Sequence, residues 1–194
     1  ISLGLVGSEM CIRDRARAGD GVWAIMVHGR GARRNEGLRA VPSASRLGMT
    51  SLLISYRNDG DAPDAQDGRY GLGTTEWRDV EAAVRYALRH GAQDVVLFGW
   101  SMGGAIALQC VDRSDLASHV RGLVLTGPVV DWIDVLEHQA RLTRIPEAIG
   151  VVGTWLISNR AGRFVTGLAA PVDFKALNWV ARAEQLRVPT LIMH

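Results

Sequence analysis

The chain has 194 residues, which is enough for one domain with a substantial buried core. Hydrophobic residues make up 47% of the sequence and charged residues 22%, the proportions of an ordinary globular protein. The formal net charge of +2 gives no reason to expect a nucleic-acid partner. The longest apolar stretch of the later half, residues 148–158, is too short to span a bilayer, and no signal-peptide pattern is evident. We therefore expect a cytoplasmic protein without a membrane span.

The beginning of the chain differs in character from the rest. Residues 1–15 read ISLGLVGSEMCIRDR, show no clear amphipathic period, and are followed by a change of composition at Ala16. This segment resembles the translated read-through of a sequencing adapter, which implies a non-native leader ahead of a domain over residues 16–194. We expect the leader to make few contacts with the fold. The alternative is a genuine strand from Ile1 to Val6.

Several short apolar runs, rich in Val, Ile and Leu, are spaced along the remaining chain. They are Val22–Val27, Thr50–Tyr56, Asp94–Phe98, Arg121–Thr126 and Val188–Met193. Each is apolar at nearly every position rather than at alternate positions, which is typical of parallel strands covered on both faces. Helical patterns lie between them. The alternation predicts an α/β fold with a doubly wound, mostly parallel sheet.

Polar residues and a clear helix follow the second of these strands. The loop after it contains four acidic residues, Asp59, Asp61, Asp64 and Asp67. Their spacing lacks the following Gly and Glu of a calcium loop, so we interpret them as a solvated loop rather than as metal ligands. The helix is predicted over Thr75–His90, with Thr74 as N-cap, Glu76 in the first turn and Gly91 as the C-terminal stop.

The most informative motif is Gly99-Trp100-Ser101-Met102-Gly103-Gly104. An apolar run precedes it and a small-residue helical run follows it, which is the strand, turn and helix that a G-x-S-x-G nucleophile elbow requires. Ser101 is therefore the expected nucleophile, although a serine hydroxyl attacks poorly until a base takes its proton. The cysteines, Cys11 and Cys110, do not form a disulfide framework, and Cys110 in the helical run is interpreted as a buried thiol.

A second motif, His28-Gly29-Arg30-Gly31, follows the first strand. Acyl transfer builds negative charge on the carbonyl oxygen, which two preorganised donors can stabilise. One donor would be the N–H of Met102, the residue after the nucleophile. The other would be the N–H of Arg30, with Gly31 as the alternative. We interpret His28 itself as a structural hydrogen-bonding residue rather than as a base.

The stretch 131–172 interrupts the alternation of strands and helices. It is too long and too apolar for a plain loop. We interpret it as a helical insertion over the carboxyl ends of the strands, a cap; the alternative is an ordinary pair of surface helices. Trp132 and Trp155 of this stretch, together with Trp100 of the elbow, either line an acyl pocket or pack in the core.

The pairing of HGRG with GWSMGG resembles the α/β-hydrolase superfamily. The motifs SYRNDGDAP at 55–63 and EWRDV at 76–80 resemble its Bem46-like and acyl-thioesterase-like bacterial branch. The resemblance runs from about Gly21 to His194. It implies a serine hydrolase that cleaves a small-molecule ester or thioester through an acyl-enzyme, with Ser101 as nucleophile, an oxyanion hole, and no metal or organic cofactor.

The resemblance also implies that the catalytic acid and histidine are missing. In such proteins the strand that matches Pro189–Met193 runs into His-Gly and a loop bearing the acid, and the catalytic histidine lies later still. This chain stops at His194. We therefore expect a C-terminally truncated hydrolase, with an incomplete sheet and little or no activity of its own.

Other residues of the chain are alternative candidates for these two roles. Asp131 is an alternative acid, or else the N-cap of a cap helix that starts at Trp132. The candidate bases are His90, His119, His138 and His194, of which His138 on the cap is the least unfavourable. Two further interpretations of the whole chain stay open: a non-catalytic binding protein on the same fold, or peptidase, lactonase or haloperoxidase-type chemistry on the same scaffold.

Overall fold

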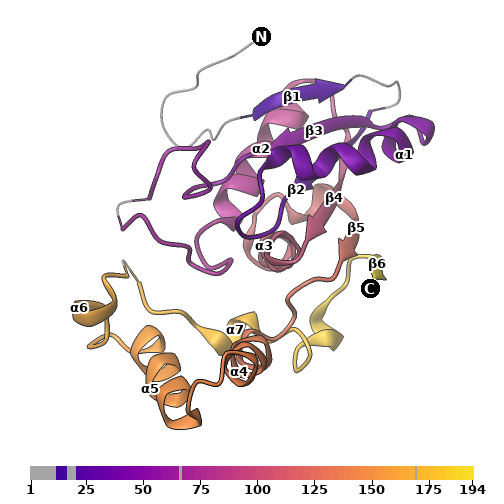
Figure 1. Cartoon of the computed structure of the whole chain (residues 1–194). Coiled ribbons are helices and arrows are strands. Elements are labelled where there is room, and N and C mark those ends of the chain that lie inside the picture. The colour runs from indigo at the N-terminus through magenta and orange to yellow at the C-terminus, as the bar shows by residue number, and fades with distance from the viewer. Residues whose placement is uncertain (1–11, 17–20, 66, 169) are drawn as a thin grey trace.

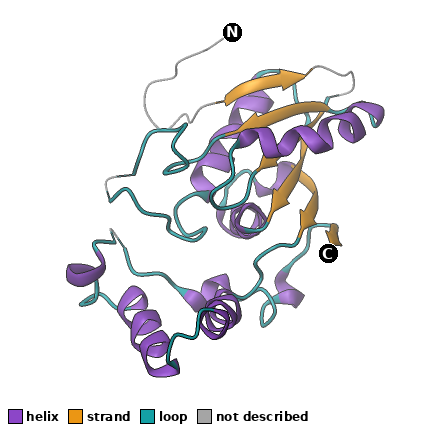
Figure 2. Cartoon of the chain, viewed as in Figure 1, coloured by secondary structure: helices purple, strands orange, loops and turns teal. Residues whose placement is uncertain are grey.

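The computed structural model describes residues 12–16, 21–65, 67–168 and 170–194. Within these ranges the strands form one sheet in the order β1-β3-β2-β4-β5-β6 (Figures 1 and 2). The strands are β1 (Ile12–Ala16), β2 (Val22–Val27), β3 (Thr50–Ile54), β4 (Asp94–Trp100), β5 (Val120–Thr126) and β6 (Thr190–Met193). Strands β2 to β6 run parallel, and β1 is antiparallel to β3.

Helices cover both faces of this sheet. In chain order, the helices of the described ranges are α1 (Val41–Arg46), α2 (Trp77–Arg89), α3 (Met102–Arg113), α4 (Trp132–Leu142), α5 (Glu147–Ser158), α6 (Arg163–Thr166) and α7 (Phe174–Leu177), with 3-10 turns η1 (Arg34–Ala40), η2 (Ala117–His119) and η3 (Ala183–Gln185). Residues of α2 and α3 pack with Ile25 and Val27, and Ala44 of α1 packs with Met26 on the opposite face. The prediction of a doubly wound α/β fold is confirmed.

All five apolar runs form strands, with small differences at their ends. The first, Val22–Val27, is observed as predicted. The third extends two residues further than expected, to Trp100, because Gly99 and Trp100 pair with Leu125 and Thr126 of β5. Strand β4 therefore carries the chain to the residue before Ser101. The buried Cys110 lies in α3, and burial raises the pKa of its thiol to about 12, as expected of an unreactive core cysteine.

Helix α2 begins later than predicted, and Thr74 is not its N-cap. The helix starts at Trp77, while the Thr74 hydroxyl donates to Gly71 O. The buried Glu76 carboxylate accepts hydrogen bonds from two neighbouring amides, Gly71 N at 2.6 Å and Gly73 N at 2.9 Å. A buried carboxylate needs donors, so this interaction decides the local chain path. The predicted stop at Gly91 is confirmed by its left-handed φ of 97°.

Part of the amino-terminal segment contacts the fold, contrary to expectation. Residues 12–16 form β1, whose backbone pairs with β3 from Ile12 opposite Ile54 to Ala16 opposite Ser51. Without β1, β3 would be the edge of the sheet. The unpaired backbone groups of an edge strand accept an extended segment largely irrespective of its sequence. The alternative strand Ile1 to Val6, and Cys11, lie outside the described residues.

Residues 131–172 form helices α4, α5 and α6, as the sequence predicted. Figure 1 shows them on the side of the sheet where β5 ends, set apart from the helices that cover its faces. These helices carry exposed apolar side chains: Ile149, Val151, Val152, Trp155, Phe164 and Val165. Among the helices of the described ranges, none is both long enough and apolar enough to cross a membrane. The interpretation as a cap over a substrate site stays a prediction.

Candidate active site

Ser101 occupies the sharp corner between β4 and α3. Its φ of 48° and ψ of −115° lie outside the helical and extended regions. A non-glycine residue in this conformation is strained, and such strain is held only where the surroundings over-determine it. Here the Ser101 amide donates to Thr126 O at 3.0 Å, and its carbonyl accepts from Val129 N at 3.2 Å. The corner leaves the Ser101 residue exposed at the amino terminus of α3.

The glycines of the motif allow this corner to close. A Cβ on Gly103 would overlap the carbonyl oxygen of Val27 in the adjacent strand. A Cβ on Gly99 would lie 2.7 Å from Cα of Gly104, and a Cβ on Gly104 would lie 2.7 Å from Cβ of Pro128. Distances of this kind do not occur in folded proteins. Glycine is therefore required because the start of α3 presses directly against the sheet.

The loop of residues 28–31 lies beside Ser101. It follows β2, which is the neighbour of β4, and Val27 is in register with Gly99. A Cβ built on Gly29 would lie 3.3 Å from Cβ of Ser101. The structure thus places both predicted motifs at the carboxyl ends of adjacent parallel strands. This is where ligand sites form in open α/β sheets.

Both backbone groups of Gly29 are already engaged. Gly29 N donates to Glu36 Oε2 at 2.7 Å. Gly29 O accepts from Ala32 N at 3.2 Å and from the Tyr56 hydroxyl at 3.2 Å. The amides of Arg30 and Met102, by contrast, donate to no acceptor in the described part of the chain. These are the two donors that the sequence predicted for an oxyanion.

His28 and Asp59 form a buried pair beneath the loop. His28 Nε2 lies 3.0 Å from Asp59 Oδ2, neither side chain is exposed, and the imidazole stacks on Tyr56 with ring centroids 4.3 Å apart. His28 is a structural hydrogen-bonding residue, as predicted. Burial alone would raise the pKa of the Asp59 carboxyl. Hydrogen bonds from His28 and from the amides of Asp61 and Ala62 outweigh burial and lower that pKa below its ordinary value.

The interpretation of the four aspartates as a solvated loop is wrong for Asp59 and incomplete for Asp61. Asp59 is buried, and Asp61 accepts from Arg33 at 2.8 Å and from Arg34 at 2.7 Å. These contacts join the loop after β3 to the turn after β2. Among the described residues, no group of three or more His, Cys, Asp or Glu could hold a metal ion.

Asp131 is a helix cap. Its Oδ1 accepts from Ile133 N at 2.9 Å, and its Oδ2 accepts from Asn178 Nδ2 at 2.6 Å. Both carboxylate oxygens are therefore occupied by structural bonds at the start of α4. The alternative role as catalytic acid has no supporting contact among the described residues.

The candidate bases lie at different places in the fold, and none hydrogen-bonds to Ser101 in the described part. His90 stacks on Tyr86 at the end of α2, and His119 lies beside Gln93 at the amino-terminal end of β5. His138 is exposed on α4. His194 follows β6, whose Met193 is in register with Thr126 and, through it, with Trp100. His194 thus leaves the same end of the sheet as Ser101, two strands or roughly 10 Å away.

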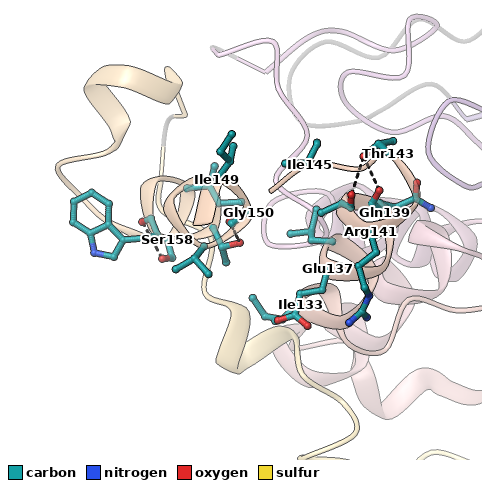
Figure 3. Close-up of a pocket in the computed structure, with 16 residues that line it drawn as sticks. Ile133, Glu137, Gln139, Arg141, Thr143, Ile145, Ile149, Gly150 and Ser158 are labelled. Carbon is teal, nitrogen blue, oxygen red and sulfur yellow. Dashed lines mark hydrogen bonds between the residues drawn. The ribbon is translucent and has the colours of Figure 1, made fainter. Parts of the chain in front are cut away.

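Of the three tryptophans considered for an acyl pocket, two belong to the core. Trp100 and Trp132 are buried on opposite sides of the sheet. Trp155 is 54% exposed and lines a groove of about 880 Å³ between α4 and α5 (Figure 3). Its lining residues come from α4, α5 and their connection, and include none from the elbow or the loop 28–31. The acyl-pocket interpretation is therefore unsupported for Trp100 and Trp132.

The sheet order, the serine corner and the two unengaged amides define a class of protein: doubly wound α/β proteins with a nucleophile-type serine turn. The chain belongs to the alpha/beta hydrolase family, since the family model described as "Alpha/beta hydrolase family" matches residues 24–192. No curated protein matches the sequence significantly.

Solved structures of this fold resemble the chain closely in shape and distantly in sequence. An esterase from Exiguobacterium antarcticum superposes with a TM-score of 0.58 at 20% identity, covering 95% of this chain and 76% of that one. An esterase from Pyrococcus furiosus gives 0.59 at 15% identity, covering 90% and 60%. Est816, described as an N-acyl homoserine lactone degrading enzyme, gives 0.58 at 22%, covering 94% and 77%. At these identities the likeness shows the fold.

Proposed function

We propose that the protein is a serine hydrolase that cleaves a carboxylic ester or thioester through an acyl-enzyme. Ser101 acts as the nucleophile, and the amides of Met102 and Arg30 bind the oxyanion. One observation carries this proposal: an exposed serine is held in a strained corner beside two backbone amides that no group in the described residues engages. Strain of this kind costs about 1–3 kcal/mol and persists chiefly at functional sites.

The chemistry follows from this arrangement. Ser101 Oγ bonds to the carbonyl carbon while a base takes its proton, and the carbonyl oxygen becomes an oxyanion between the two amides. The tetrahedral intermediate collapses, its bond to the alcohol or thiol breaks, and the base returns the proton to that leaving group. Water then hydrolyses the Ser101 ester by the reverse sequence of proton transfers. The start of α3 adds a favourable dipole at the oxyanion.

Two of the similar structures are described as esterases, and a third is described as a lactone degrading enzyme, which is a related ester chemistry. Thioester cleavage and membership of the Bem46-like and acyl-thioesterase-like branch rest on the motifs at 55–63 and 76–80. Thioester cleavage proceeds through the same acyl-enzyme step as ester cleavage. The substrate type and the branch are therefore narrower forms of this proposal.

The test compares Ser101→Ala with the parent protein, using p-nitrophenyl acetate, a matched acetyl thioester and a fluorophosphonate probe. We expect turnover and labelling by the parent protein and neither by Ser101→Ala. Equal turnover by Ser101→Ala would contradict the proposal and favour a binding protein.

A further inference from the structure

The direction of the Arg30 amide is set by the carbonyl in front of it. Gly29 C=O and Arg30 N–H belong to one peptide unit, which is planar, and the described residues contain no cis peptide bond. In a trans unit the two groups point in opposite directions. Whatever holds Gly29 O therefore also aims the Arg30 N–H.

Three donors converge on Gly29 O. His28 Nδ1 lies 2.8 Å from it, the Tyr56 hydroxyl 3.2 Å, and the Ala32 amide 3.2 Å. Tyr56 is fully buried, and burial raises the pKa of its hydroxyl well above the ordinary value, so it remains a donor. Two of the three donors are side chains that lie outside the backbone of the loop.

The preceding peptide unit is held at both ends. Its carbonyl, His28 O, accepts from the Tyr56 hydroxyl at 3.1 Å, so this hydroxyl is shared between two carbonyls. Its amide, Gly29 N, donates to Glu36 Oε2. Of the four polar groups in the two peptide units around Gly29, only the Arg30 N–H is left for a ligand in the described structure.

The His28 ring bridges Asp59 and the loop carbonyl. Its Nδ1 lies 2.8 Å from Gly29 O, and its Nε2 lies 3.0 Å from Asp59 Oδ2. Neither the His28 nor the Asp59 side chain is exposed to solvent, so the Asp59 carboxylate holds the ring in place from below the loop. Asp59 thus acts on Gly29 O through His28.

We propose that Tyr56, Glu36 and the His28–Asp59 pair are positioning residues for the oxyanion hole, and that they aim the Arg30 amide at the substrate carbonyl bound over Ser101. The inference rests on the proposed function and adds residues that the two sequence motifs do not contain. A donor contributes only when it points at the developing charge, and small displacements of such groups cost large factors in rate.

The first experiment measures the direction of the Arg30 N–H directly, through its residual dipolar coupling in aligned ¹⁵N-labelled protein. The variants are Tyr56→Phe, which removes one hydroxyl, and Asp59→Asn, which removes the charge that holds His28. Tyr70→Phe is the matched control, because Tyr70 packs edge-on against Tyr56 with centroids 6.3 Å apart and donates to neither loop carbonyl. We expect the Arg30 coupling to change by about half or more in the two variants, as motion averages it. It should stay constant in Tyr70→Phe, and the couplings of β2 and β4 should stay constant throughout.

The second experiment measures ester turnover on the same proteins. Tyr56→Phe and Asp59→Asn should lower kcat roughly 10- to 100-fold with KM unchanged, since the lost interaction exists in the transition state. Unchanged kcat together with an unchanged Arg30 coupling in both variants overturns the inference. If either variant fails to fold, Glu36→Gln is measured instead. The Glu36 side chain is partly exposed and accepts from Gly29 N, so this change weakens the hold on the peptide between His28 and Gly29. The couplings need no turnover, so they separate this inference from the proposed function, which fails on its own if Ser101→Ala keeps the parent activity.

Discussion

Asp59 Oδ2 lies 3.0 Å from His28 Nε2, and neither side chain is exposed to solvent. This contact joins the loop after β3 to the loop after β2, across the neighbouring parallel strands that carry them. It also lies directly beneath the peptide that precedes the Arg30 amide. A buried hydrogen-bonded pair of this kind is costly to break, because the remaining polar partner is left buried without its bond.

The first prediction concerns the pH dependence of this pair. Burial alone would raise the pKa of Asp59, but hydrogen bonds from His28 and the Asp61 and Ala62 amides lower it below the ordinary value of 3.8. The stabilisation by the carboxylate is therefore complete above that ordinary value and is lost as pH falls through the lower folded pKa. Asp59→Asn should destabilise the protein by about 2 kcal/mol at pH 7. The Tm difference between the two proteins should stay constant from pH 7 to pH 5 and shrink as the pH falls below the ordinary value of 3.8. A difference that stays constant in acid would contradict the assignment.

The second prediction concerns Gly103. An added Cβ would overlap Val27 O, so Gly103→Ala should push α3 away from β2 and lower the free energy of unfolding by about 3 kcal/mol or more. Gly153→Ala in α5 is the control, since nothing lies within 4 Å of its Cβ position and alanine favours a helix by about 1 kcal/mol. Denaturant unfolding of both variants measures the difference. Equal stability of the two would show that the elbow is looser than described.

The third prediction separates strain from chemistry at Ser101. Ser101→Gly and Ser101→Ala should both abolish turnover, but glycine relieves the left-handed φ of 48° and alanine does not. We expect Ser101→Gly to be more stable than Ser101→Ala by about 1 kcal/mol. Thermal unfolding at neutral pH is the measurement. If Ser101→Ala is as stable as Ser101→Gly or more stable, the corner is not strained.

The fourth prediction concerns Asp131. Its carboxylate caps α4 and binds Asn178, so Asp131→Ala should cost about 1–2 kcal/mol and leave turnover per folded molecule unchanged. Asp173→Ala is a matched control, because Asp173 caps α7 through Lys175 N and Ala176 N at 3.1 Å. Loss of turnover in Asp131→Ala alone would restore the alternative role as catalytic acid.

Local patterns predicted the framework of this protein well. Continuous apolar runs predicted five strands, and the small residues around Ser101 predicted a turn that only glycine can close, because both depend on neighbours within a few residues. Prediction was weaker where a side chain finds a distant partner. Thr74 is a plausible N-cap by residue type, but the buried Glu76 carboxylate accepts the hydrogen bonds of the nearby amides. Residues 12–16 have no strand pattern, but the open edge of β3 pairs with them.

The sequence by itself determined the α/β fold and identified the serine corner and the loop of residues 28–31, because hydrophobic period and turn chemistry are local properties. Only the tertiary structure decided which groups meet at that corner. Tyr56 and Asp59 follow β3, and their bonds to residues 28–29 exist because β3 and β2 are neighbours in the sheet. Glu36 reaches Gly29 N from the 3-10 turn η1. Strand order arises from the packing of the whole chain. The direction of the Arg30 N–H depends on that order, so no local sequence pattern predicts it.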